Sequence, residues 1–218
     1  MVAKSGSIVS AALKIACTSA VVNGSAAESF RGSTAPTRVS GLFGRWPSRT
    51  ARFRISPSLV YAIIRTESNF NPFAVSGAPA YGLMQLVPTS GGREALKRVQ
   101  GVDQTPTPEY LFDPEHNIEL GTAYLGVLGS TEFHAIDNQS SRDYCVIAAY
   151  NTGPRNVTRT FANDKREAFN DINGLEPAVL YDRLRTSLPF PETRQYVVKV
   201  TGYRKQFVNT PESVTAMQ

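Results

Sequence analysis

The chain has 218 residues, of which 41% are hydrophobic and 19% are charged, a balance that describes one globular domain with a core and a short appendage. Its formal net charge of +5 suggests an anionic partner, such as a cell-surface polymer or a membrane surface. The lysines and arginines are scattered rather than arranged in a stripe with aromatic residues, so nucleic acid is not the expected partner. Two cysteines, Cys17 and Cys145, and two histidines without paired spacing predict no metal site.

Residues 1–50 are predicted to be a signal-like segment followed by a linker. A basic start precedes an apolar stretch over residues 8–22, and small residues follow up to Ala27, an order typical of a secretory signal peptide. Lys14 interrupts the stretch and stands where a lipoprotein signal before Cys17 needs a leucine-like residue. We therefore expect export to the periplasm or cell envelope. Outer-membrane anchoring, membrane association through the N-terminus and a remnant without an export role are left open.

The first predicted helix of the folded part covers about residues 57–70. Ser56 is a plausible N-cap, and Pro57 suits the first helical position because its missing N–H would have no partner there. Pro72 restricts the residue before it and ends the helix.

Glu67 is the candidate catalytic residue of this helix. Ile63, Ile64 and Phe70 lie three or four positions away, so the carboxyl group shares a helix face with bulky apolar side chains. Burial and the negative end of the helix dipole both disfavour the charged form, and both are expected to raise the pKa of this carboxyl group. A general acid that works near neutral pH needs such a shift.

The rest of the chain is also predicted to be helical. A loop over residues 69–81 and a short apolar segment at 82–87 lead into a helix at 88–99, and an irregular, proline-containing connection fills 101–114. Further helices are expected at 117–128, at 143–150 with Ser141 as N-cap, at 155–161, at 164–172 and after Pro191. The predicted fold class is all-α, with about eight helices and with long loops where function is expected.

Four motifs follow one another along these elements. They are Glu67-Ser68, Gly82-Leu83-Met84-Gln85, Ala149-Tyr150-Asn151 and the segment 192–196, which reads ETRQY. Together they resemble the lytic transglycosylases, a family of lysozyme-like enzymes that cleave peptidoglycan, and residues 64–92 are most similar to the membrane-bound lytic murein transglycosylase C type. The resemblance implies a goose-lysozyme-like helical catalytic domain with a substrate groove, here residues 51–218.

The resemblance also implies a set of site residues. Glu67 is the single acid and base, and the contacts to the glycan come from Ser76, Met84 through its backbone, Gln85, Val87, Tyr150, Asn151 and Tyr196. For Ser76, Gln85 and Asn151, turn and cap hydrogen bonds are an equally good explanation. For the two tyrosines, the alternative is core packing with a satisfied hydroxyl group.

The implied chemistry needs one carboxylate rather than two. The acid protonates the glycosidic oxygen, the N-acetyl group of the substrate helps to stabilise the charge at C1, and the C6 hydroxyl of N-acetylmuramic acid (MurNAc) then attacks C1. We find no acidic residue in the motifs that pairs naturally with Glu67, and Glu94, Asp103 and Glu119 are predicted to be solvated. No metal or cofactor is expected. The expected partner is the glycan strand of alternating MurNAc and N-acetylglucosamine (GlcNAc), bound by a monomer.

Two alternatives stay open. A goose-type lysozyme-like muramidase or a chitin hydrolase would share the fold but would use a second acidic residue to activate water. A non-catalytic peptidoglycan-binding protein would keep the groove without cleavage.

Overall fold

Helices make up most of the computed structural model, which describes residues 51–207. The predicted signal and linker over residues 1–50, and residues 208–218, lie outside this part. The α-helices are α3 (Pro57–Glu67), α4 (Arg93–Gln100), α5 (Pro108–Phe112), α6 (Pro114–Val127), α7 (Gln139–Thr152), α8 (Pro154–Arg159), α9 (Lys165–Asn173), α10 (Pro177–Ser187) and α11 (Pro191–Phe207). Shorter helical turns are η2 (Ala51–Phe53), η3 (Pro88–Gly92) and η4 (Leu128–Glu132). Within residues 51–207 the only β-type pairings are two isolated bridges, so the all-α prediction is confirmed.

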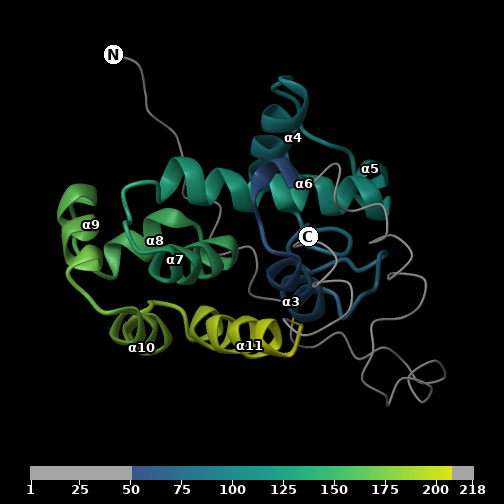
Figure 1. Ribbon diagram of the computed structural model, residues 1–218. Coiled ribbons are helices and arrows are strands. Elements are labelled where there is room, and N and C mark those ends of the chain that lie inside the picture. Colours follow the sequence, from purple (N-terminus) through teal and green to yellow (C-terminus); the bar gives the residue numbers. More distant parts are fainter. Residues whose placement is uncertain (1–50, 208–218) are drawn as a thin grey trace.

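Two groups of helices lie on either side of α6. In Figure 1, α7 lies between α6 and the pair α10 and α11, while α4 and α5 pack against α6 on its other side. The helix α11 packs most extensively on α3 and also contacts α7. The buried faces of α3 and α7, at residues 59–64 and 145–150, supply the centre of the apolar core. The ends of α3, α7 and α11 are therefore held at one place by the core itself.

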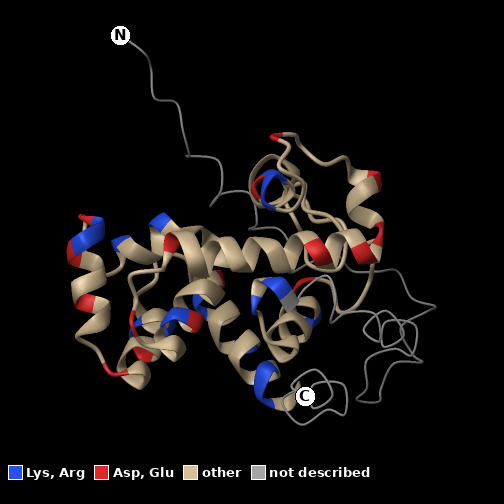
Figure 2. Ribbon diagram, turned by 45° about the horizontal axis from the view of Figure 1, so that its top comes forward, with Lys and Arg blue, Asp and Glu red and all other residues tan. Residues whose placement is uncertain are grey.

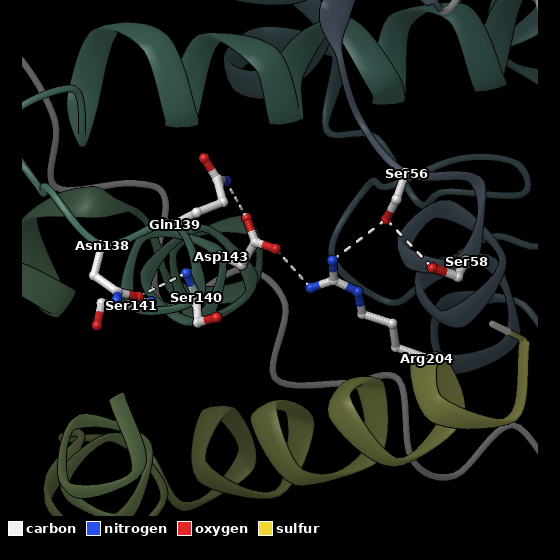
Figure 3. Close-up of polar contacts among 8 residues, drawn as sticks. All are labelled: Ser56, Ser58, Asn138, Gln139, Ser140, Ser141, Asp143 and Arg204. Atoms are coloured by element: carbon white, nitrogen blue, oxygen red, sulfur yellow. Dashed lines mark hydrogen bonds and ion pairs between the residues drawn. The ribbon is translucent and has the colours of Figure 1, made fainter. Parts of the chain in front are cut away.

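A polar cluster also joins α11 to α7 and α3 (Figure 3). The guanidinium of Arg204 donates to Asp143 Oδ2 at 2.7 Å and to Ser56 Oγ at 3.4 Å. The second oxygen of Asp143 accepts from Gln139 Nε2 at 2.7 Å. The side chains of Arg204 and Asp143 are only 28% and 20% exposed, so salt screens this pair less than a fully exposed one.

The start of α7 differs from the prediction. Its N-cap is Asn138, whose side-chain oxygen accepts from the backbone N–H groups of Ser140 and Ser141 (Figure 3). Ser141, the predicted cap, is instead a buried residue of the first turn. Asparagine caps helices as well as serine does, so two candidates three residues apart could not be ranked by residue type alone.

Prolines begin several helices that the sequence analysis placed too late or missed. The helix α5 lies inside the segment predicted to be irregular, with Thr107 as its cap, and α6 begins at Pro114 after the cap Asp113 rather than at residue 117. The helix α10 begins at Pro177 and was not predicted. Proline was interpreted as a helix start at Pro57 but not at Pro108, Pro114 or Pro177, although it is well suited to the first position of a helix.

Candidate active site

Glu67 is the last residue of α3 and lines a cavity of about 120 Å³. The preceding residues Ile63 and Ile64 are fully buried, which fixes the end of the helix against the core. The cavity is lined by residues from α3, the loop 69–81, the segment 82–87, α7 and α11, namely Thr66, Glu67, Ser76, Ala80, Gln85, Asn151, Glu192, Gln195, Tyr196 and Lys199.

Tyr196 binds the carboxyl group of Glu67 directly. Its hydroxyl donates to Glu67 Oε1 at 2.8 Å, although the two residues lie 129 positions apart in the chain. Burial, the neighbouring Glu67 charge, Tyr150 and this hydrogen bond together raise the pKa of Tyr196 well above 10. The hydroxyl therefore keeps its proton over the whole ordinary pH range and stays a hydrogen-bond donor. A hydrogen bond of this kind favours the ionised form of the acceptor carboxylate.

Tyr150 lies behind the cavity rather than in its wall. Its hydroxyl donates to the backbone oxygen of Met84 at 2.8 Å, and its ring packs against Tyr124 with centroids 5.6 Å apart. Burial raises its pKa well above 10, with Glu67 and Tyr124 adding to the shift. Tyr150 thus supports the segment 82–87 through the backbone of Met84.

The segment 82–87 is a tight, buried turn held by Asn117 of α6. The side-chain oxygen of Asn117 accepts from Met84 N at 2.8 Å, and its amide nitrogen donates to the backbone oxygens of Tyr81 and Leu111 at 2.9 and 2.7 Å. Gly82 has a φ of +76°, and a Cβ added there would lie 2.3 Å from the Asn117 amide. Only glycine fits this position without displacing the turn.

Gln85 and Ser76 both have hydrogen bonds that shape the loop 69–81. The amide nitrogen of Gln85 donates to the backbone oxygens of Ala74 and Gly82, each at 2.9 Å. The hydroxyl of Ser76 donates to the backbone oxygen of Ala78 and accepts from the N–H of Ala80 at 3.3 Å. These contacts agree with the structural alternative for both residues, and both also line the cavity.

The remaining predicted residues divide between wall and core. Asn151 lines the cavity and accepts at Oδ1 from the hydroxyl of Thr193 at 2.7 Å, which joins α7 to α11. Val87 is buried, and its backbone oxygen accepts from Gly92 N in the turn η3. Met84 is fully buried, and its sulfur lies close under Gly121 of α6.

The structure thus brings five of the eight predicted site residues to the cavity wall: Glu67, Ser76, Gln85, Asn151 and Tyr196. Three lie outside the wall: Met84, Val87 and Tyr150. The role of each in binding or catalysis stays a prediction.

One face of α11 lines the cavity with residues that were not predicted. Glu192, Gln195 and Lys199 line the cavity together with Tyr196, at the spacing i, i+3, i+4 and i+7 that places side chains on one side of a helix. Helical spacing counted in both directions from Tyr196 would have predicted Glu192, Gln195 and Lys199. Thr66 and Ala80 carried no comparable signal.

Two acidic residues add to the expectations. Glu192, a residue of the fourth motif, lies in the wall of the same cavity as Glu67, and the expectation that the acid works without a partner carboxylate stays a prediction. Glu119 is only partly exposed, because its side chain is 14% exposed and accepts a hydrogen bond from Arg52 at 3.1 Å.

No group of three or more His, Cys, Asp or Glu residues within residues 51–207 comes together as a metal site. No helix in that range is long and apolar enough to cross a membrane.

Comparison with known proteins places this geometry in a family. Residues 45–173 match the family described as the Transglycosylase SLT domain. A relative in Klebsiella pneumoniae, named membrane-bound lytic murein transglycosylase C, is 46% identical over 170 residues, which is 78% of this chain and 47% of the relative. The protein of the same name in Yersinia enterocolitica is 44% identical over 156 residues, covering 72% and 43% of the two chains. The chain therefore spans about half the length of these curated relatives.

Solved structures give the same grouping. An inactive mutant of the lytic transglycosylase Slt from Pseudomonas aeruginosa is similar with a TM-score of 0.61 and 28% identity, over 84% of this chain and 25% of that one. A complex of the 70-kDa soluble lytic transglycosylase with bulgecin A is similar with a TM-score of 0.57 and 28% identity, over 82% and 26%.

Proposed function

The chain belongs to the Transglycosylase SLT domain family, and from this premise we propose that it is a peptidoglycan lytic transglycosylase. It cleaves the β-1,4 bond between MurNAc and GlcNAc without water and leaves 1,6-anhydroMurNAc ends. The observation that carries the proposal is the pair of Glu67 and Tyr196, which places one hydrogen-bonded carboxyl group in the wall of a cavity.

Glu67 serves first as acid and then as base. Its proton passes to the glycosidic oxygen as the bond from C1 to that oxygen breaks, and the N-acetyl group of the substrate shares the positive charge that develops. The carboxylate formed in this step is stabilised by the Tyr196 hydroxyl, which is already oriented toward Oε1 at 2.8 Å. The negative charge of Glu67 is thus stabilised as soon as it forms, by a donor that is already oriented.

The second step is an attack within the substrate. Glu67 accepts the proton of the C6 hydroxyl of MurNAc while that oxygen bonds to C1, so the acid returns to its starting form and no atom of water is consumed. An intramolecular nucleophile has a large advantage in effective concentration over a separate one. The reaction therefore needs no second carboxylate.

Glu192 is the specific observation that favours a hydrolase as second candidate. A carboxylate in the same cavity could activate water and give a lysozyme-like reaction with reducing ends. We expect Glu192→Gln to keep the anhydro product and to change kcat by less than about tenfold, whereas loss of a general base costs roughly 10²–10⁴-fold. A loss of that size, with reducing-end products in the wild type, would establish hydrolysis.

The decisive experiment is mass spectrometry of the soluble fragments that the full chain releases from purified peptidoglycan. Fragments about 18 Da lighter than the hydrolytic products, by one water, support the transglycosylase. Reducing-end fragments support the hydrolase, and binding without release supports a non-catalytic binding protein. Because one structural neighbour is a complex with bulgecin A, bulgecin A should inhibit the release.

The site of action and assembly are part of the proposal. We propose that the protein acts in the cell envelope as a monomer, which agrees with relatives named membrane-bound murein enzymes. Fractionation of cells and light scattering of the purified chain test the two parts separately. A cytoplasmic pool alone, or a stable dimer, would contradict them.

A further inference from the structure

We propose that a second cavity binds carboxylate groups of the peptides that peptidoglycan strands carry, an inference that rests on the proposed function. The cavity has a volume of about 280 Å³ and lies where η4, α8 and α9 meet. It is lined by Glu132, Pro154, Arg155, Thr158, Arg159, Asn163 and Lys165. None of these residues belongs to the wall of the first cavity.

The cavity carries unmatched positive charge. Lys165 Nζ lies 3.1 Å from Glu132 Oε2, so these two charges are paired. Arg155 and Arg159 are exposed, and neither has an ion pair within the described part of the chain. They lie four residues apart on α8, where like charges repel one another, and an anionic ligand between them would remove that cost.

The second cavity is close to the proposed cleavage site. Asn151 lines the first cavity and Pro154 lines the second, with only two residues between them. A chain of this length spans at most about 11 Å even when fully extended. A peptide of four residues reaches roughly as far, so a peptide on a strand that passes Asn151 is long enough to reach Pro154.

The lining selects among anions. Two guanidinium groups suit carboxylate and phosphate oxygens, which they can bind through paired hydrogen bonds. The ion pair of Lys165 and Glu132 places an ammonium and a carboxylate group beside the two arginines, an arrangement that suits a peptide, which carries both kinds of group. Figure 2 shows acidic as well as basic segments on the helices at this end of the molecule. The mixed lining therefore favours a peptide.

The test compares soluble glycan strands that carry their peptides with strands from which an amidase has removed them. The double variant Arg155→Gln/Arg159→Gln should lose about tenfold in kcat/KM on the peptide-bearing strands, through KM, and nothing on the stripped strands. The matched control is Arg98→Gln/Lys205→Gln, which removes the same charge from exposed positions outside both cavities and should behave as wild type on both substrates.

The outcomes separate this inference from the proposed function. Equal losses on both substrates, or no loss on either, overturn the peptide site while cleavage by the wild type stands. Inhibition of the wild type by inorganic phosphate on stripped strands, absent in the arginine variant, would assign the cavity to phosphate instead. A wild type that cleaves neither substrate overturns the proposed function itself.

Discussion

At the scale of single residues, the two tyrosines near Glu67 separate into different roles. Both were predicted by one argument, from motifs that resemble a family. The hydroxyl of Tyr196 donates to the acid, and the hydroxyl of Tyr150 donates to the backbone of the turn 82–87. Nothing in the sequence distinguishes them, because both lie on helices among apolar residues and a hydroxyl shows no partner until the fold is known.

Glu67→Gln is expected to reduce cleavage by roughly 10²–10⁴-fold or more, because the amide cannot donate a proton to the glycosidic oxygen. Stability should change by no more than about 0.5 kcal/mol, since the amide oxygen can still accept from Tyr196. Fragment release and thermal unfolding measure the two effects. Glu115→Gln makes the same change at an exposed position of α6 and should be silent. Activity near the wild-type rate in Glu67→Gln would end the mechanism.

The matched pair Tyr196→Phe and Tyr150→Phe should have opposite signatures. Tyr196→Phe removes the donor to Glu67 and is expected to lower kcat by about tenfold with little loss of stability. Tyr150→Phe leaves the Met84 oxygen without this donor in a buried site, at a cost of about 1–3 kcal/mol. Denaturant unfolding and kcat, measured on both variants, give the comparison. Equal effects of the two changes would contradict the assignment.

The same tyrosines predict a feature of the pH profile. Because burial raises both pKa values well above 10, neither hydroxyl ionises as the pH rises toward about 10. An alkaline decline below that pH should therefore reflect loss of a proton from the acid, and it should persist in Tyr196→Phe. A decline that disappears in this variant would assign it to the tyrosine.

At the scale of elements, most of the helices could be predicted because apolar residues recur at helical spacing. Two helices, α5 and α10, were missed, and two starts were wrong: α6 begins at Pro114, and α7 is capped by Asn138 rather than Ser141. The face of α11 with Glu192 and Lys199 could have been found from its spacing. The turn 82–87 could not, because its shape depends on Asn117, a residue more than thirty positions away that looks like an ordinary helix residue.

Asn117→Ala tests that dependence. It removes the acceptor of Met84 N and the donor of two backbone oxygens, and we expect a loss of more than about 3 kcal/mol in stability together with most of the activity. Asn138→Ala, which removes only a helix cap, should cost about 1 kcal/mol and spare the activity. Chemical denaturation and fragment release measure both. An Asn117→Ala protein as active and stable as Asn138→Ala would contradict the role of this side chain.

At the scale of the whole molecule, the site is formed by segments that lie far apart in the sequence. Glu67 ends α3, Asn151 lies near the end of α7, and Tyr196 lies on α11, so the acid is positioned only when the three helices dock. Core packing supplies most of that docking, and Arg204 adds a polar link from α11 to both other helices (Figure 3). Contacts between residues of different helices depend on the complete fold, and the local sequence around each residue does not predict its partner.

The link makes a prediction about coupling between stability and activity. Arg204→Ala should lower stability by about 1–2 kcal/mol, because it breaks a partly buried ion pair and leaves Asp143 with one fewer partner. A double-mutant cycle with Asp143→Ala should return a coupling energy near 1 kcal/mol, because either single change already removes the ion pair between the two residues. If docking of α11 positions Tyr196, both single variants also lose activity, and Arg185→Ala, which breaks a more exposed pair on α10, does not. Full activity in Arg204→Ala at a lowered stability would mean that the apolar contacts between α3 and α11 alone hold Tyr196 against the acid.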